Sequence, residues 1–168
     1  MNNYYTHITN LLDQNKSIYF ENESMKKHTT FGIGGKVRIL IYPKDLNELM
    51  QLIKTINKNK IKFYFIGSGS NLLISDKNLR CIILSLKKTF KKILFNNNTV
   101  NVEAGVMLGT LVKELNKRDI TGYESLIGVP GTVGGALIMN AGAFGSEISN
   151  NFISARTITN NGTIKKYD

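Results

Sequence analysis

The sequence predicts an α+β protein built from two lobes, and three observations support this. The chain has 168 residues, 42% of them hydrophobic, which is enough to form a packed core. Apolar patterns typical of strands and helices alternate as β–α–β–β–β and then as β–β–α–loop–β–β. A short polar segment near residues 86–90 separates the two series. We therefore expect an N-terminal helix and lead-in at 1–28, a first lobe at 29–88 and a second lobe at 89–168.

The first half of the chain alternates between strand-like and helix-like patterns. Val37 and Ile41 belong to a period-two strand pattern, which Pro43 ends. Asp45 can cap the helix that follows, where apolar residues recur at i, i+3, i+4 and i+7. In order, we expect a short helix around 8–12, a charged irregular lead-in at 20–27, a strand at 37–42, a helix from 46 and strands at 61–66, 72–75 and 81–86.

The second half begins and ends with a hairpin signal. Asparagines occupy 96–98 between two strand-like segments, and Asn160-Asn161-Gly162 does the same near the C-terminus. Between them lie an apolar helical stripe from Leu108 to Leu115 and a glycine-rich stretch at 122–145 with almost no charge. The expected elements are strands at 90–95 and 99–104, the helix from 108 to about 118, a helical turn at 136–140 and strands at 152–159 and 163–167.

Composition limits the classes of function. Net charge of +10 raises the hypothesis of a nucleic-acid-binding module. The 18 lysines outnumber the four arginines and are mostly scattered, which favours a solvated basic surface instead. Cys81 is the only cysteine, so an intramolecular disulfide and a cysteine-based zinc cluster are excluded. A polar N-terminus and the lack of a long apolar run favour a soluble cytoplasmic protein, with no membrane or metal role.

The segment at 67–71, Gly-Ser-Gly-Ser-Asn, directly follows a predicted strand. Glycines let main-chain N–H groups converge on an anion, and Ser68, Ser70 and Asn71 add side-chain donors. A dinucleotide fingerprint would need glycine where Leu72 stands, followed by a helix, and no Walker A lysine is present. The segment is therefore either a phosphate contact or a plain tight turn.

The segment at 128–136, Gly-Val-Pro-Gly-Thr-Val-Gly-Gly-Ala, carries a stronger signal. Pro130 sets the entry to the turn, and the N–H groups at the start of the helical turn that follows would attract a diphosphate. Close packing of backbone layers is the alternative explanation for its small residues. The placement of Thr132 and Asn140 within the same short span favours ligand binding. We expect this stretch and the 67–71 loop to face each other between the lobes.

Four ordered motifs, at 29–35, 67–72, 128–136 and 140–145, resemble those of the UDP-N-acetylenolpyruvoylglucosamine reductase family. The resemblance implies a two-lobed FAD-binding domain of the vanillyl-alcohol-oxidase (PCMH) type, with FAD between the lobes. The resemblance implies that the 67–71 loop and the 130–135 turn hold the diphosphate, and that Asn140, Gly142 and Ala143 lie along the flavin or its ribityl chain. The other cofactor-binding residues that it implies are Gly67, Ser68, Gly69, Ser70, Asn71, Leu72, Pro130, Gly131, Thr132, Gly134 and Gly135.

The resemblance also implies a reaction. NADPH would reduce the flavin, which would then reduce the enolpyruvyl group of UDP-N-acetylglucosamine enolpyruvate during peptidoglycan synthesis. The family's arginine, serine and glutamate lie beyond Asp168, in and before a third, substrate-binding domain. The chain is therefore expected to be a truncated form of the enzyme, and the alternative is a non-catalytic FAD-binding remnant.

Other polar residues are weaker candidates. Arg156 lies in a predicted strand, before the family's arginine position, and is read as a surface or lobe-boundary residue. His7 falls on the N-terminal helix and His28 precedes the first motif, so neither is expected to be catalytic. Glu124 either shapes the flavin pocket or only stabilises a turn.

Overall fold

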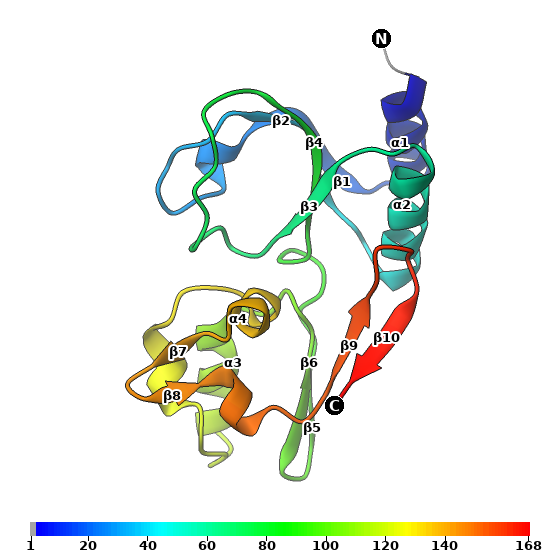
Figure 1. The fold of residues 1–168 in the computed structure, drawn as a ribbon. Helices are drawn as coiled ribbons and strands as arrows, with labels where there is room; N and C mark the ends of the chain where they lie inside the picture. Colours follow the sequence, from blue (N-terminus) through cyan, green and yellow to red (C-terminus); the bar gives the residue numbers. More distant parts are fainter. Residues whose placement is uncertain (1–2) are drawn as a thin grey trace.

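In the computed structural model, which describes residues 3–168, a four-stranded sheet forms the centre of the first lobe (Figure 1). The strand order is β1-β2-β4-β3. β2, β4 and β3 run parallel and β1 is antiparallel to β2. The carboxyl ends of the parallel strands therefore meet at one edge of the sheet. The elements of this lobe are α1 (Asn3–Gln14), β1 (Ile18–Ser24), the 3₁₀ helix η1 (Met25–Lys27), β2 (Lys36–Tyr42), α2 (Leu46–Lys58), β3 (Phe63–Ile66) and β4 (Leu79–Ser85).

Helices α1 and α2 cover one face of this sheet (Figure 1). Ile8 and Leu12 of α1 and Leu52 of α2 are fully buried against Ile39 and Ile82 of the sheet. The predicted cap of α2 is confirmed, because the Asp45 carboxylate accepts the Glu48 N–H at 2.9 Å. Burying these aliphatic side chains supplies the main stabilisation of the lobe.

The opposite face of the sheet packs against the long connection from β3 to β4, residues 67–78. Leu72 and Ile74 of this connection pack against the buried residues Met25, Leu40 and Ile83. The connection begins with the 67–71 loop at the carboxyl edge of the sheet. This packing holds both ends of the loop on the first lobe.

The second lobe lies below the first in Figure 1 and surrounds a separate apolar core. Leu108 and Val112 of α3 and Leu126 of η2 are its most buried members, and Val133 of α4 packs beside them. The elements are β5 (Ile93–Asn96), β6 (Thr99–Val102), α3 (Leu108–Asn116), η2 (Glu124–Gly128), α4 (Val133–Met139), β7 (Gly142–Ala143), β8 (Ser146–Glu147) and η3 (Ile148–Asn151).

The final hairpin, β9 (Ala155–Ile158) with β10 (Ile164–Tyr167), differs from the expected division of the chain. It lies alongside α2 of the first lobe (Figure 1). Ile158 packs against the core beneath α1 and α2, and the Asn57 amide donates to the Asn160 carbonyl. Ile158 and the turn of this hairpin thus contact the first lobe, although the hairpin follows the second lobe in the sequence.

Three local predictions were wrong. The charged segment around residues 20–27 is not irregular, because residues 18–24 pair with β2 as an edge strand. The predicted strand at 72–75 is an extended loop. The predicted helical turn at 136–140 begins three residues earlier, as α4, because Thr132 caps it. The other predicted helices and hairpins are confirmed within a few residues of their expected ends.

Candidate functional site

The two glycine-bearing segments meet between the lobes, as predicted. The Ser70 hydroxyl donates to the Pro130 carbonyl at 3.0 Å, and a Cβ at Gly67 would lie 2.6 Å from Thr132 Oγ1. A Cβ at Gly131 would lie 3.6 Å from Ser70 Oγ. Glycine is thus required at position 67 for the two segments to approach this closely.

The 67–71 loop presents main-chain donors that the protein itself does not use. Within residues 3–168, the N–H groups of Ser68, Gly69 and Ser70 donate to no protein acceptor. Gly69 has φ of +82°, the left-handed conformation that turns successive N–H groups toward one concave side. The Ser68 and Ser70 hydroxyls are already engaged, because Ser68 donates to Ser70 at 3.2 Å and Ser70 donates to Pro130. The exposed Asn71 amide makes no hydrogen bond within residues 3–168, so anion recognition in this loop depends on the backbone and on Asn71.

The start of α4 behaves differently from the prediction. The Val133 N–H donates to the Val106 carbonyl at 2.8 Å and the Gly134 N–H to the Ala104 carbonyl at 3.0 Å. These amides have protein partners and are not free donors for a diphosphate. Glycine at position 134 is explained by packing, since a Cβ there would lie 2.8 Å from that of Ala104. The N–H groups of Gly131 and Thr132, by contrast, donate to no protein acceptor within residues 3–168, so the 130–135 turn keeps two main-chain donors where it faces the loop.

Thr132 joins the two segments from a buried position. Its side chain is buried, with the residue only 2% exposed, and accepts the Gly135 N–H at 3.3 Å, so it caps α4 while facing Gly67.

We predict that Thr132→Val lowers the free energy of unfolding by about 1 kcal/mol, the usual cost of a lost cap. For a chain of this size the melting temperature should fall by about 2–4 °C. Thermal unfolding without FAD, with exposed Thr110→Val as control, tests this; equal stability of the two variants would contradict it.

The predicted flavin-side residues lie at the second lobe's short hairpin. Gly142 and Ala143 line a polar hollow of about 470 Å³ together with Glu147 and Asn150. Asn140 ends α4 in the left-handed conformation, and its amide donates to the Glu147 carboxylate at 2.6 Å. Asn140 therefore orients the hairpin with one N–H of its amide, and the other N–H and the amide oxygen remain exposed. Glu147 was not predicted; the only sequence signal for it is its spacing from Asn150, with which it forms a capping box.

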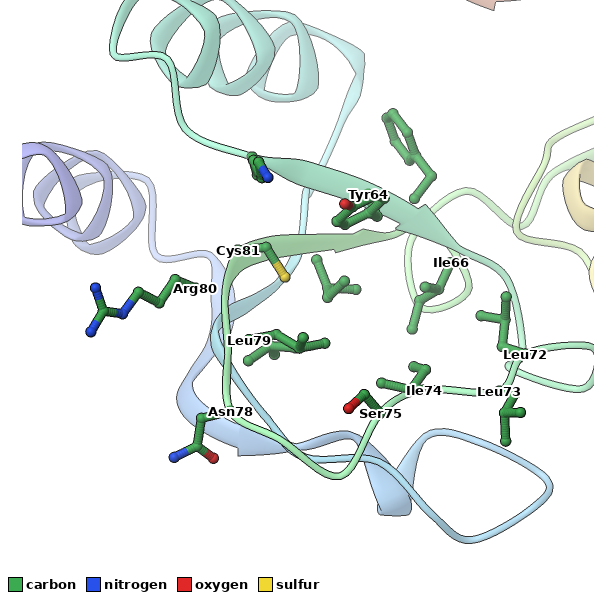
Figure 2. A pocket seen from close by; sticks show the side chains of 14 residues that line it. Tyr64, Ile66, Leu72, Leu73, Ile74, Ser75, Asn78, Leu79, Arg80 and Cys81 are labelled. Atoms are coloured by element: carbon green, nitrogen blue, oxygen red, sulfur yellow. The ribbon is translucent and has the colours of Figure 1, made fainter.

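An apolar cavity of about 530 Å³ lies between the first lobe's sheet and the connection from β3 to β4 (Figure 2). Ile66, Leu72 and Cys81 are among the side chains around it. The Leu72 side chain thus points into the first lobe, although it was expected to be a cofactor-binding residue. Burial raises the pKa of the Cys81 thiol, which keeps it protonated and unreactive.

The remaining polar candidates have structural environments. The Glu124 carboxylate accepts the Gly122 N–H at 2.8 Å, and hydrogen bonds from its own N–H and that of Gly122 lower its pKa; this supports the turn role. Arg156 and His7 are exposed, on β9 and α1. His28 contacts Glu23 instead of any reacting group.

No helix among residues 3–168 combines the length and apolar character needed to span a bilayer. The same part of the chain contains no cluster of three histidine, cysteine or acidic side chains arranged to bind a metal ion.

Comparisons with known proteins agree with this geometry. A family described as "FAD binding domain" matches residues 37–168, which include both segments that meet between the lobes. UDP-N-acetylenolpyruvoylglucosamine reductase of Alkaliphilus oremlandii is 37% identical over 97% of this chain and 53% of its own length. The Clostridium kluyveri reductase is 42% identical over 84% of this chain and 46% of its own length. The chain spans about half the length of the curated relatives it matches.

Solved structures share the fold. The crystal structure of the reductase from Thermus caldophilus matches 90% of this chain and 52% of its own, with a TM-score of 0.70 and 26% identity. A variant of Phl p 4, a glucose dehydrogenase, matches 99% of this chain and 38% of its own, with a TM-score of 0.72 and 11% identity. Because its sequence identity is so low, the match to Phl p 4 is evidence for the fold and not for a shared function.

Proposed function

Because this chain belongs to the FAD-binding domain family, we propose that it is the FAD-binding part of a UDP-N-acetylenolpyruvoylglucosamine reductase. The observation that carries this proposal is the 67–71 loop, called the diphosphate loop from here on. Its N–H groups at Ser68, Gly69 and Ser70 are unused by the protein and lie where the two lobes meet. A diphosphate needs such N–H donors, and because the loop's glycines have no Cβ atoms the diphosphate can approach the main chain closely.

The residues of the two segments and of the short hairpin would contribute to FAD binding in different ways. The diphosphate loop would hold the diphosphate through main-chain N–H groups, while Pro130, Gly131 and Thr132 of the second lobe would lie opposite it. Gly134 would contribute by letting α4 pack closely on Ala104, and Gly135 by donating its N–H to the capping Thr132 side chain. Gly142 and Ala143, held in place by the Asn140–Glu147 pair, would border the flavin end.

The complete reaction is proposed from the resemblance and the relatives' names. Bound FAD would supply hydride transfer from NADPH to the enolpyruvyl group of the sugar nucleotide. The residues of this chain would bind and orient FAD and exclude water around it. Proton delivery would come from the half of the relatives that this chain does not span.

Titration with FAD tests the proposal directly. We expect saturable binding, measured by quenching of flavin fluorescence. At an FAD concentration of about 100 times Kd, the protein should gain about 2.7 kcal/mol of stability, or about 5–10 °C in melting temperature for a domain of this size. Riboflavin, which lacks the diphosphate, is the matched control ligand and should bind much more weakly. Equal affinity for the two flavins, or no binding of either, would contradict the proposed site.

A second measurement separates the catalytic and non-catalytic forms of the proposal. NADPH oxidation that depends on UDP-N-acetylglucosamine enolpyruvate would show turnover by the chain itself. FAD binding without turnover would limit its role to cofactor binding. Purified protein that retains nucleic acid and not flavin would favour the basic-module alternative.

A further inference from the structure

The motif at residues 29–35 is the one sequence motif that the proposed site leaves without a role. It follows His28 and leads into β2, so residues 28–35 are called the support segment here. The segment does not line the hollow at the flavin end or the apolar cavity. Its hydrogen bonds instead reach the connection between β3 and β4, which begins with the diphosphate loop.

The support segment holds this connection at two places. Near its start, the Thr30 N–H donates to the Gly69 carbonyl at 3.1 Å. Near its end, the Gly35 N–H donates to the Ser75 carbonyl at 2.7 Å and the Gly34 N–H to the Asp76 carboxylate at 3.1 Å. The diphosphate loop is thus tied to the first lobe through the support segment and to the second lobe through Ser70.

The tightest contact in this arrangement involves the backbone of His28. A Cβ at Gly69 would lie 1.8 Å from the His28 carbonyl oxygen and 3.1 Å from the Thr29 Cα. The two main chains therefore pack directly against each other at Gly69. A small displacement of His28 would be transmitted to the loop, because no flexible side chain lies between them.

Two interactions fix the position of His28. Its N–H donates to the Met25 carbonyl at 2.8 Å, closing η1. Its ring Nε2 lies 2.9 Å from the Glu23 carboxylate on β1, and the two side chains are only 13% and 15% exposed. Lys27 also faces this carboxylate, at 3.6 Å. The hydrogen bond from His28 lowers the pKa of Glu23, with the charge of Lys27 acting in the same direction and burial opposing it.

We infer that His28 is a positioning residue for FAD. Anchored to Glu23, it holds the support segment so that the backbone N–H groups of the diphosphate loop converge before the ligand arrives. This inference rests on the proposed FAD site. Preorganisation of this kind increases affinity because the free loop has less conformational freedom to lose on binding.

A set of histidine variants tests this role. Gln places an N–H donor close to the position of histidine Nε2, so His28→Gln should preserve the contact with Glu23, whereas His28→Ala removes it. His7→Ala is the matched control, because His7 is the chain's other histidine and is exposed on α1. Glu23→Gln keeps a hydrogen-bond acceptor without the charge and provides a milder perturbation if His28→Ala does not fold.

Two readouts are needed. The first is amide hydrogen exchange of residues 67–72 in the FAD-free protein; His28→Ala should raise it by about tenfold through local opening. The second is FAD affinity, which should fall by about tenfold in His28→Ala, less in Glu23→Gln, and hardly at all in His28→Gln and His7→Ala. Riboflavin affinity should be unaffected by all four substitutions.

The inference is overturned if His28→Ala leaves loop exchange and FAD affinity unchanged, or if His28→Gln is as impaired as His28→Ala. It is also overturned if exchange rises uniformly across the chain, since His28 would then only stabilise the fold. If the unmodified protein binds no FAD, the proposed function fails. The exchange readout then still decides whether His28 holds the loop.

Discussion

Replacing Gly69 with alanine should weaken FAD binding by about 100-fold, equivalent to roughly 2.7 kcal/mol of binding free energy. The new Cβ would lie 1.8 Å from the His28 carbonyl oxygen and 2.9 Å from its carbon. Both are backbone atoms, so a rotamer change cannot relieve the contact and the loop must move. Movement of the loop would separate the N–H groups of Ser68, Gly69 and Ser70 that we assign to the diphosphate.

The same substitution should also lower the stability of the FAD-free protein. Overpacking costs about 1–3 kcal/mol, and alanine at a φ of +82° adds about 1 kcal/mol. Gly32→Ala is the control, because Gly32 also has a positive φ, +66°, but has no atom within 4 Å of its Cβ position. Flavin fluorescence and thermal unfolding measure both effects. If Gly69→Ala and Gly32→Ala have the same FAD affinity and the same melting temperature, the close contact with His28 does not determine the position of the loop.

Gly105→Ala should cause a large loss of stability, although Gly105 lies outside the site. Gly105 is buried next to the connection between the lobes, and a Cβ there would lie 2.1 Å from the Leu86 carbonyl oxygen and 2.6 Å from that of Phe90. Its φ is not positive, so the expected cost arises from this steric contact alone. The connection would have to move away from the second lobe, at a cost of about 3 kcal/mol.

Thermal unfolding should show this as a melting temperature lower by about 6–12 °C. The matched control is Gly128→Ala, because no atom lies within 4 Å of that Cβ position and its φ is not positive. The control should change stability by no more than about 0.5 kcal/mol. Equal melting temperatures for Gly105→Ala and Gly128→Ala would contradict this prediction, because they would show that the connection between the lobes can move at little energetic cost.

The elements that sequence patterns predicted well are those whose signal is local. Helix α2 carries an apolar stripe and a capping aspartate, and both act within a few residues. Strand β1 was missed because its side chains are mostly polar, and its conformation comes from pairing with β2. The apolar run at 72–75 resembles a strand, yet its side chains fill the first lobe's core from a loop.

For the site, too, features with a local sequence signal were predicted and features set by tertiary contacts were not. Glycine and serine patterns predicted which two segments would meet, and the Ser70–Pro130 hydrogen bond confirms that they do. They did not predict which N–H groups stay free. That depends on Ala104 and Val106, whose carbonyls take the N–H groups at the start of α4 through tertiary pairing. The role of Asn140 likewise depends on Glu147 across the hairpin.

The contact of the β9–β10 hairpin with α2 affects how the protein folds during its synthesis on the ribosome. Asn57 and Asn160 are 103 residues apart in sequence, and the whole of the second lobe is translated between them. Until Ile158 has been synthesised, the apolar surface beneath α1 and α2 lacks part of its cover. The nascent first lobe therefore completes its packing only after the second has left the exit tunnel, so the two lobes are expected to mature together rather than one after the other.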